Sequence, residues 1–344
     1  MDEVTIIGVD LAKSVFQVHG ATSDGTKVFS KKLTRSQFAK FMSKQPSCLV
    51  AMEACGSAHY WARSMQEFGH DVRLIAPVYV KPFVKRQKSD AADAEAIVEA
   101  ASRPNMRFVV IKNEQQQARG ALFRTRELLI RQRTQSVNAL RAHLAEFGVI
   151  VPVGIFNVRR LSAYVEDGKS ILPVSIREIG AVFLEQIDRL TVKVEELEKS
   201  IKAASKRSDI SRRLQTIPGV GPITAMAIEA FAPDMNNFQK GRNFSAWLGL
   251  VPQQHSTGGK QILGKTSKMG QKDIRRLFII GAISVVRAAI RKGLSETSWL
   301  GRILVRKPRM VVAIALANKM ARTTWALLVK NEDYRDPMTE GMSA

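Results

Sequence analysis

The sequence predicts an α/β domain over residues 1–112, followed by a mostly α-helical connector and a mostly α-helical C-terminal domain. Two observations carry this prediction. In the first hundred residues, short apolar runs typical of buried strands alternate with amphipathic segments of helical period. Beyond residue 114, long segments with apolar residues at helical spacing follow one another instead. The first pattern indicates an α/β layer, and the second indicates helices packed on helices.

The N-terminal elements begin with three strands. Residues 4–9 form an apolar run that ends at Asp10, and residues 15–21 and 27–33 indicate two strands joined around the turn signal Asp24-Gly25. The elements expected next are a helix over 36–44, a strand over 48–52, a helix over 57–68, a strand over 72–75 and a helix over 91–102. This order is that of an RNase H-like fold.

The connector, over residues 113–208, is predicted to hold two long helical stretches. The first runs from about 114 to 147 and is rich in Arg and Gln, and a break with Pro and Gly follows at 151–155. In the second stretch, apolar residues recur at alternating four- and three-residue steps: Phe183, Ile187, Leu190, Val194, Leu197 and Ile201. Such a heptad seam fits a helical hairpin within the chain as well as a coiled coil between subunits.

The C-terminal domain, over residues 209–331, is predicted to begin with a helix-hairpin-helix. Residues 214–225 have the pattern of a helix, a tight glycine turn and a second helix. The turn amides and the start of the second helix suit a backbone phosphate, so Gly219 and Gly221 are candidate nucleic-acid-binding residues. An ordinary helix connection is the alternative. The remaining expectations are helices over 241–248, 272–291 and 309–328, a polar segment over 252–270, and a flexible tail over 332–344.

The charge balance indicates a nucleic-acid partner. Lysine and arginine number 53 against 31 aspartate and glutamate residues, which gives a formal net charge of +22. Such a chain attracts polyanions through salt-dependent contacts with phosphates. DNA and RNA are therefore the expected partners, although a merely basic protein would have the same balance.

Composition argues against several other classes of protein. A hydrophobic fraction of 45% and a charged fraction of 24% are ordinary for a soluble globular chain. No stretch approaches the ~20 apolar residues that a bilayer crossing needs, and the chain opens with Met1-Asp2-Glu3 and not with a basic start and an apolar run. Cys48 and Cys55 lack the spacing of a zinc site or a disulfide framework. We therefore expect a cytoplasmic protein without a membrane partner.

Four acidic residues are candidate metal ligands. Asp10 ends the first apolar strand, Glu53 ends the later strand 48–52, and Asp90 and Asp93 stand three residues apart at a predicted helix start, hence on one helix face. Phosphoryl chemistry with two metal ions needs several carboxylates that converge on cations ~3.5–4 Å apart. If the two strands are neighbours, Asp10 and Glu53 emerge at the same edge of the sheet.

Each of these residues also has a structural interpretation. Asp10 could cap a strand end, Asp90 could be a helix N-cap, and Glu53 could be a surface residue. An acidic residue directly after a buried apolar run, twice in a basic protein, favours a metal site. Magnesium is the expected ion, because the candidate ligands are all hard oxygens and the sequence has no Cys/His cluster.

Short motifs along most of the chain carry a family resemblance. In the N-terminal part they are Ile7-Gly-Val-Asp10-Leu-Ala-Lys13, Met52-Glu53-Ala-Cys-Gly-Ser57 and Lys88-Ser-Asp90-Ala-Ala-Asp93-Ala94. In the C-terminal part they are Ile217-Pro-Gly-Val-Gly221, Phe244-Ser-Ala-Trp-Leu-Gly-Leu-Val-Pro252, His255-Ser-Thr-Gly-Gly259 and Ser267-Lys-Met-Gly270. The sequence thereby resembles the DEDD transposases of the insertion sequence one-ten family, which includes the eleven-eleven branch and the Piv-type DNA invertases.

The resemblance implies a RuvC-like N-terminal domain in which Asp10, Glu53, Asp90 and Asp93 bind magnesium, with two ions expected. It also implies a helical connector and a C-terminal transposase domain that supplies a nucleophilic serine. A non-coding RNA from the ends of the element is a further implied partner, which would pair with donor and target DNA. Base pairing could then carry specificity while the protein holds the backbone.

The segment 254–260 is the candidate hydroxyl site. Its glycines let a phosphate approach the backbone, and Lys260, Lys265 and Lys268 supply positive charge. A plain Gly-Gly turn with exposed hydroxyls is the alternative. Counting backward from Ser267 places the family's serine on Ser256, our preferred nucleophile, whereas counting forward from Pro252 places it on Thr257. His255 could act as a base or be a polar loop residue.

The mechanism expected from these residues is strand cleavage by the Ser256 hydroxyl through a transient protein–DNA phosphoester. The distance in sequence between the two sites and the heptad seam favour a homo-oligomer, a dimer or a tetramer, with a composite site. One rival is a metal-dependent nuclease or Holliday-junction resolvase that uses water as the nucleophile. The other rival is a nucleic-acid-binding protein without catalytic activity.

Overall fold

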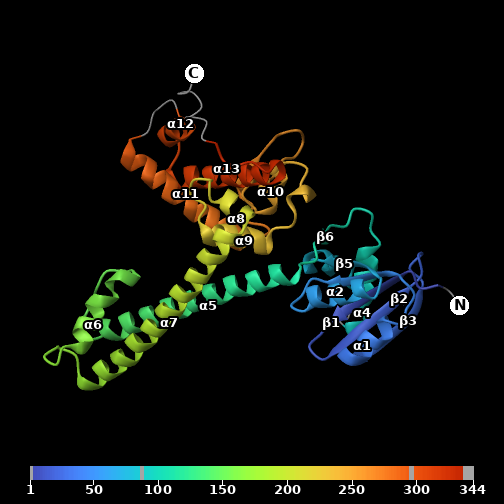
Figure 1. Cartoon of the computed structure of the whole chain (residues 1–344), viewed down its shortest axis with the longest axis horizontal. Coiled ribbons are helices and arrows are strands. Elements are labelled where there is room, and N and C mark those ends of the chain that lie inside the picture. The colour runs from blue at the N-terminus through green and yellow to red at the C-terminus, as the bar shows by residue number, and fades with distance from the viewer. Residues whose placement is uncertain (1–2, 86–88, 294–297, 336–344) are drawn as a thin grey trace. The chain divides into compact units, whose positions relative to one another are not determined.

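The computed structural model describes residues 3–85, 89–293 and 298–335, and it divides into two compact units, Met1–Glu114 and Gln115–Ala344 (Figure 1). Lys88 of the third motif and residues 336–344 of the expected tail lie outside the described residues. The finer division of the helical part at residues 208 and 331 stays a prediction.

A six-stranded mixed sheet forms the centre of the N-terminal unit. Its strands are β1 (Ile6–Leu11), β2 (Val15–Ala21), β3 (Lys27–Thr34), β4 (Leu49–Glu53), β5 (Asp71–Ile75) and β6 (Phe108–Val109). They are ordered β3-β2-β1-β4-β5-β6, with β1, β4 and β5 parallel and the other pairs antiparallel. The predicted RNase H-like fold is confirmed, and the short edge strand β6 is an addition to the predicted elements.

Helices cover both faces of this sheet, because the buried strands are apolar on both sides. The helices of the unit are α1 (Arg35–Met42), α2 (Ala58–Glu67), α3 (Pro77–Val80), the short 3-10 helix η1 (Lys81–Phe83) and α4 (Asp90–Ala101). On the face of α1 and α2, Phe16, Phe38 and Trp61 pack edge to face with ring centroids 5.1–5.2 Å apart. On the other face, α4 packs an alanine-rich side against β1 and β2.

Local hydrogen bonds fix where α1 and α4 begin. Thr34 and Gln37 form a capping box at the start of α1. At α4, the Ser89 side chain accepts a hydrogen bond from the Ala92 amide. Ser89 is therefore the N-cap, and Asp90 is the first helical residue and not the cap.

The second unit begins with a helical hairpin. Its helices are α5 (Glu114–Ala145), η2 (Ile155–Asn157), α6 (Val158–Glu166) and α7 (Val174–Arg207). In the heptad seam, Ile187, Leu190, Val194 and Ile201 are buried within the chain. The Arg126 guanidinium joins α5 to Glu198 of α7 by a hydrogen bond of 3.0 Å. Most of the seam therefore serves an intramolecular hairpin.

The rest of the second unit is a helical bundle with one β-hairpin. Its elements are α8 (Asp209–Leu214), α9 (Pro222–Phe231), η3 (Met235–Asn237), α10 (Gly241–Trp247), β7 (Pro252–Gln254), β8 (Leu263–Thr266), α11 (Lys272–Lys292), α12 (Trp299–Arg306) and α13 (Arg309–Lys330). Its core includes the fully buried Phe244 and Phe278. Among the described residues, no helix is both long enough and apolar enough to span a membrane.

Candidate active site

Asp10 and Glu53 lie at the same edge of the sheet. The parallel register of β1 and β4 pairs Gly8 with Ala51 and Val9 with Met52, so Asp10 and Glu53 are the next residues on the two strands. Both are half-buried. Because side chains alternate along a strand, Asp10 shares its face with Gly8, and Glu53 shares its face with Ala51. The two carboxylates therefore belong to one face and one end of the sheet.

Helix α4 covers that same face, and Gly8 determines how closely it packs. A Cβ added at Gly8 would lie 2.5 Å from the Ala94 carbonyl oxygen and 2.6 Å from Cγ2 of Val98. A side chain at this position would push the helix away, so the glycine of the first motif is required by packing. The first turn of α4 carries Asp90, which is exposed, and Asp93, which is half-buried.

An ion pair shows which end of the sheet the start of α4 approaches. The strand register aligns Asp10 with Gln17 and Gln17 with Lys32, which puts Asp10 and Lys32 in one row on one face. The Lys32 Nζ atom lies 3.7 Å from Oδ2 of Asp90. The start of α4 is therefore directed toward the sheet end that carries Asp10 and Glu53.

The four carboxylates share a face but do not form a closed metal site in this structure. Among residues 3–85, 89–293 and 298–335, no group of three or more His, Cys, Asp or Glu side chains is arranged to hold a metal ion. The donor chemistry fits a hard divalent cation, because all four candidates offer carboxylate oxygens. Binding would require the Asp90 carboxylate, which now pairs with Lys32, to turn toward Asp10 and Glu53.

The second candidate site is a β-hairpin. Strands β7 and β8 pair, and Thr257 and Lys260 form an isolated bridge around Gly258 and Gly259. Both glycines have a positive φ, 54° and 76°, as a two-residue turn of this kind requires. The predicted polar segment over 252–270 is therefore largely a hairpin with an exposed tip.

The Ser256 hydroxyl has two partners in this hairpin. It donates to Oε1 of Gln254 at 3.0 Å and accepts from the Ile262 amide at 3.2 Å. Thr257 stands one residue closer to the turn and is exposed. His255 is also exposed, and its ring lies against Gly264, where an added Cβ would be 2.6 Å from Nε2.

The base of the hairpin is held by two close backbone crossings. A Cβ at Gly249 would lie 2.2 Å from the Met269 carbonyl oxygen, and one at Gly270 would lie 1.9 Å from that of Trp247. The Arg275 guanidinium donates to the carbonyls of Leu248 and Met269, each at 2.8 Å. Burial lowers the pKa of Arg275. These close contacts explain the glycines at Gly249 and Gly270, which belong to the motifs that end at Pro252 and Gly270.

The remaining candidate residues differ in their surroundings. Lys260, Lys265 and Lys268 are exposed on or beside the hairpin. Gly219 has φ +85°, and a Cβ there would lie 2.8 Å from the Gly281 carbonyl oxygen of α11. Nothing lies within 4 Å of a Cβ at Gly221, which precedes α9 and has no side-chain cap. Packing therefore explains the glycine at Gly219. No packing contact among the described residues explains the glycine at Gly221, which remains a candidate nucleic-acid-binding residue.

Sequence reasoning missed Lys32, Gln254 and Arg275. The strand that contains Lys32 had a signal, because the Asp24-Gly25 turn predicts a hairpin, but the pairing of Lys32 with Asp90 had none. Gln254 and Arg275 had none, because their roles depend on hydrogen bonds to the Ser256 hydroxyl and to two backbone carbonyls.

Two family models match the chain. One, described as the transposase IS116/IS110/IS902 family, matches residues 211–296, and the other, a DEDD transposase model of the IS110 type, matches residues 7–149. A probable family 20 transposase of Pseudomonas aeruginosa is 47% identical over 331 residues, 96% of this chain and 98% of the relative.

Two further relatives extend over nearly the full length of the chain. The transposase for insertion sequence element IS1111A of Coxiella burnetii is 36% identical and covers 97% of this chain and 92% of the relative. A pilin gene-inverting protein of Moraxella bovis is 23% identical and covers 96% and 97%. The similarity thus includes both the carboxylate edge and the hairpin.

Proposed function

Since the chain belongs to the IS110 family of DEDD transposases, which cleave DNA, we propose that it cuts and rejoins DNA strands with a serine nucleophile and magnesium-bound carboxylates. Membership of this family implies a divalent metal. Asp10, Glu53, Asp90 and Asp93 would hold the metal, which we propose to be two magnesium ions. When bound, these ions supply positive charge to the reacting phosphate and lower the pKa of a coordinated hydroxyl.

The observation that carries this proposal is the common face of Asp10, Glu53 and the start of α4. The strand register supports it, and the Lys32–Asp90 pair, combined with that register, brings the start of α4 to the same end of the sheet. Nucleic-acid binding without catalysis would not require acidic residues to gather at one edge of a basic chain. The packing at Gly8 adds support, because it fixes the height of α4 above that edge.

The proposed nucleophile is the Ser256 hydroxyl. Its oxygen forms a bond to the phosphorus while the bond from phosphorus to the leaving sugar oxygen breaks, and the serine proton passes by way of a base to that oxygen. Gln254 accepts a hydrogen bond from the hydroxyl in the resting hairpin and orients the group. Rejoining reverses these steps on a new strand end. Thr257 is the alternative nucleophile, and His255 is a candidate base.

We also propose three partners for the chain: DNA, a guide RNA and further copies of the chain itself. The net charge of +22 suits a guide RNA in addition to DNA, and base pairing would then select donor and target sites. Gly221, Lys260, Lys265 and Lys268 are proposed phosphate contacts, with Gly219 as the turn residue that supports them. Exchange of strands needs several active sites, which favours a dimer or a tetramer.

Covalent capture of labelled DNA tests the proposed chemistry. A 5′- or 3′-labelled substrate that carries the element's junction, with guide RNA transcribed from its flanks, should give a protein-linked product with the wild-type chain and magnesium. Ser256→Ala should abolish that product and Thr257→Ala should leave it. Asp10→Asn should also abolish it, because the metal is lost.

Three results would contradict the proposal. Loss of the linked product in Thr257→Ala alone would move the nucleophile to Thr257. Free cleavage products without a protein link, unchanged in Ser256→Ala and Thr257→Ala, would favour a nuclease or resolvase that uses water. Products unchanged in Asp10→Asn would exclude the carboxylate site altogether.

A further inference from the structure

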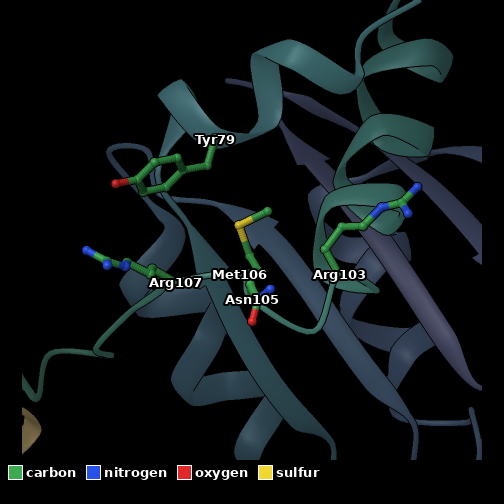
Figure 2. A pocket seen from close by; sticks show the side chains of 5 residues that line it. All are labelled: Tyr79, Arg103, Asn105, Met106 and Arg107. Carbon is green, nitrogen blue, oxygen red and sulfur yellow. The ribbon is translucent and has the colours of Figure 1, made fainter. Parts of the chain in front are cut away.

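The N-terminal unit contains an open pocket of about 380 Å³, separate from the four carboxylates. Figure 2 shows its five lining residues: Tyr79, Arg103, Asn105, Met106 and Arg107. They come from α3, from the residues just after α4, and from the turn before β6. The volume is near the lower end of the range for ligand sites, ~300–1,000 Å³, which suits a single flat ring with its substituents better than a large ligand.

The side chains combine an aromatic surface with positive charge. Tyr79 is 43% exposed, and Met106 is half-buried against the core beneath α4. Arg107 is exposed and has no ion-pair partner among the described residues. In Figure 2 the Tyr79 hydroxyl and the Arg107 guanidinium extend to the same side, with Met106 between them and Arg103. An exposed ring beside a free guanidinium suits a ligand that is both aromatic and anionic.

Arg103 has a different role in the wall. It pairs with Glu99 one turn earlier on α4, and its guanidinium lies 5.6 Å from the centroid of the Phe83 ring. These contacts hold the side chain in place and neutralise part of its charge. The anion is therefore expected at Arg107, while Arg103 shapes the opposite wall.

The strand register places the pocket near the carboxylates. Glu53 pairs with Ile75, and Ile75 pairs with Phe108, so the three residues form one row across the sheet on the face of α4. Neighbouring strands are ~4.8 Å apart, which puts Phe108 roughly 10 Å from Glu53. Met106 and Arg107 directly precede Phe108. The pocket therefore adjoins the edge that carries Asp10 and Glu53, at a distance of one or two nucleotides of an extended strand.

We propose that this pocket binds one unpaired base of the nucleic-acid strand that crosses the carboxylate edge. The base stacks on the Tyr79 ring, the Asn105 amide lies at the base edge, and the Arg107 guanidinium pairs with the adjoining phosphate. This inference rests on the proposed function, because it assumes a strand at the carboxylates. A DNA strand and an RNA strand offer the same base and phosphate, and the experiment below distinguishes them.

The chemistry favours a single strand over a duplex. In a double helix the faces of the bases are covered by their neighbours, so a stacking ring gains access only to an unpaired or flipped base. The Arg73 guanidinium lies 5.0 Å above the exposed Phe108 ring beside the pocket, which extends the aromatic and cationic surface. Such a surface is typical of sites that follow a single strand without reading its sequence.

Fluorescence anisotropy with the full chain tests the pocket, using a labelled 20-nucleotide oligo-dT, an oligo-U of equal length and a 20-base-pair duplex. Removal of one base stack, Tyr79→Ala, should weaken binding of at least one single strand roughly 5- to 150-fold. Tyr79→Phe should stay within about 2-fold, because the ring remains. Tyr164→Ala is the matched control, since Tyr164 is also 43% exposed but lies on α6.

The salt dependence gives a second measurement. Arg107→Ala should lower the slope of log K against log salt by about 0.7, the value for one phosphate contact in a single strand. A larger loss with oligo-U than with oligo-dT identifies an RNA strand, and the reverse identifies a DNA strand. Either result supports the proposal.

The proposal is overturned if Tyr79→Ala binds both single strands within 2-fold of the wild type, or if it weakens the duplex equally. It is also overturned if Tyr164→Ala loses as much affinity, because the effect would then not belong to the pocket. The binding assay contains no magnesium, so it measures binding separately from cleavage. If the wild-type chain cleaves DNA but these binding tests fail, only the proposal for the pocket is rejected. If the DNA products are unchanged in Asp10→Asn, the proposed function is rejected.

Discussion

The close contact between Gly8 and α4 gives the sharpest prediction. In Gly8→Ala, the new methyl group would lie 2.5 Å from the Ala94 carbonyl oxygen, whereas ordinary contact begins at 3.4 Å, so α4 must move by roughly 0.9 Å. Overpacking of this kind costs about 1–3 kcal/mol. The displaced helix carries Asp90 and Asp93, the proposed metal ligands, and a catalytic group misplaced by about 1 Å loses roughly 100-fold in rate.

Hydrogen–deuterium exchange and DNA cleavage measure the two effects separately. The amides of α4 should exchange roughly 5- to 150-fold faster in Gly8→Ala, which corresponds to the loss of about 1–3 kcal/mol. Cleavage at saturating magnesium should fall about 100-fold. Gly56→Ala is the matched control, because no atom lies within 4 Å of a Cβ there. Wild-type exchange and cleavage in Gly8→Ala would refute the packing argument.

Three further predictions concern stability, each measured by urea unfolding. Gly219→Ala should lose about 1–3 kcal/mol, because its φ is +85° and its Cβ would meet α11, whereas Gly221→Ala should stay within about 0.5 kcal/mol; equal losses would contradict this. Burial lowers the pKa of His59 to about 4, so its stabilising effect is complete above pH 6.5 and is lost as the pH falls from 6.5 toward 4. Because His59 is only half-buried, the free energy of unfolding of the wild type should fall by about 1 kcal/mol between pH 7 and pH 5. The free energy of unfolding of His59→Gln should fall less over that interval. An equal fall in both proteins would contradict this role of His59. Glu229→Ala should lose about 2–4 kcal/mol, because the buried carboxylate binds Arg119, Ser208 and Ser211, and a neutral effect would argue against this network.

The strands and helices of the N-terminal unit could be predicted because their apolar periods are strong. The strand that carries Asp10, the strand that ends at Glu53 and the start of α4 near Asp90 could all be predicted, although β1 continues one residue past Asp10, to Leu11. Strand β6 was not, because two residues carry no period. The β7–β8 hairpin was missed for a related reason: all three residues of β7 are exposed, so no apolar alternation marks it.

The position of Lys32 shows a different limit. The Asp24-Gly25 turn predicts that β2 and β3 pair, but a register shift between Gly20 and Ala21 decides which residues lie opposite each other. A bulge of this kind has no reliable sequence signal, and one residue of shift would turn the Lys32 side chain to the other face of the sheet. The partner of Asp90 therefore required the structure.

The Lys32–Asp90 pair affects the resting state of the enzyme. The lysine amine acts as a tethered monovalent counterion for the helix start, and both side chains are about two-thirds exposed. Water and salt weaken such a pair to at most about 1 kcal/mol, so a divalent ion bound at the proposed site would displace it at little cost. On the proposed function, the edge would stay partly neutralised when magnesium is scarce, and it would be free to bind the ion when magnesium is plentiful.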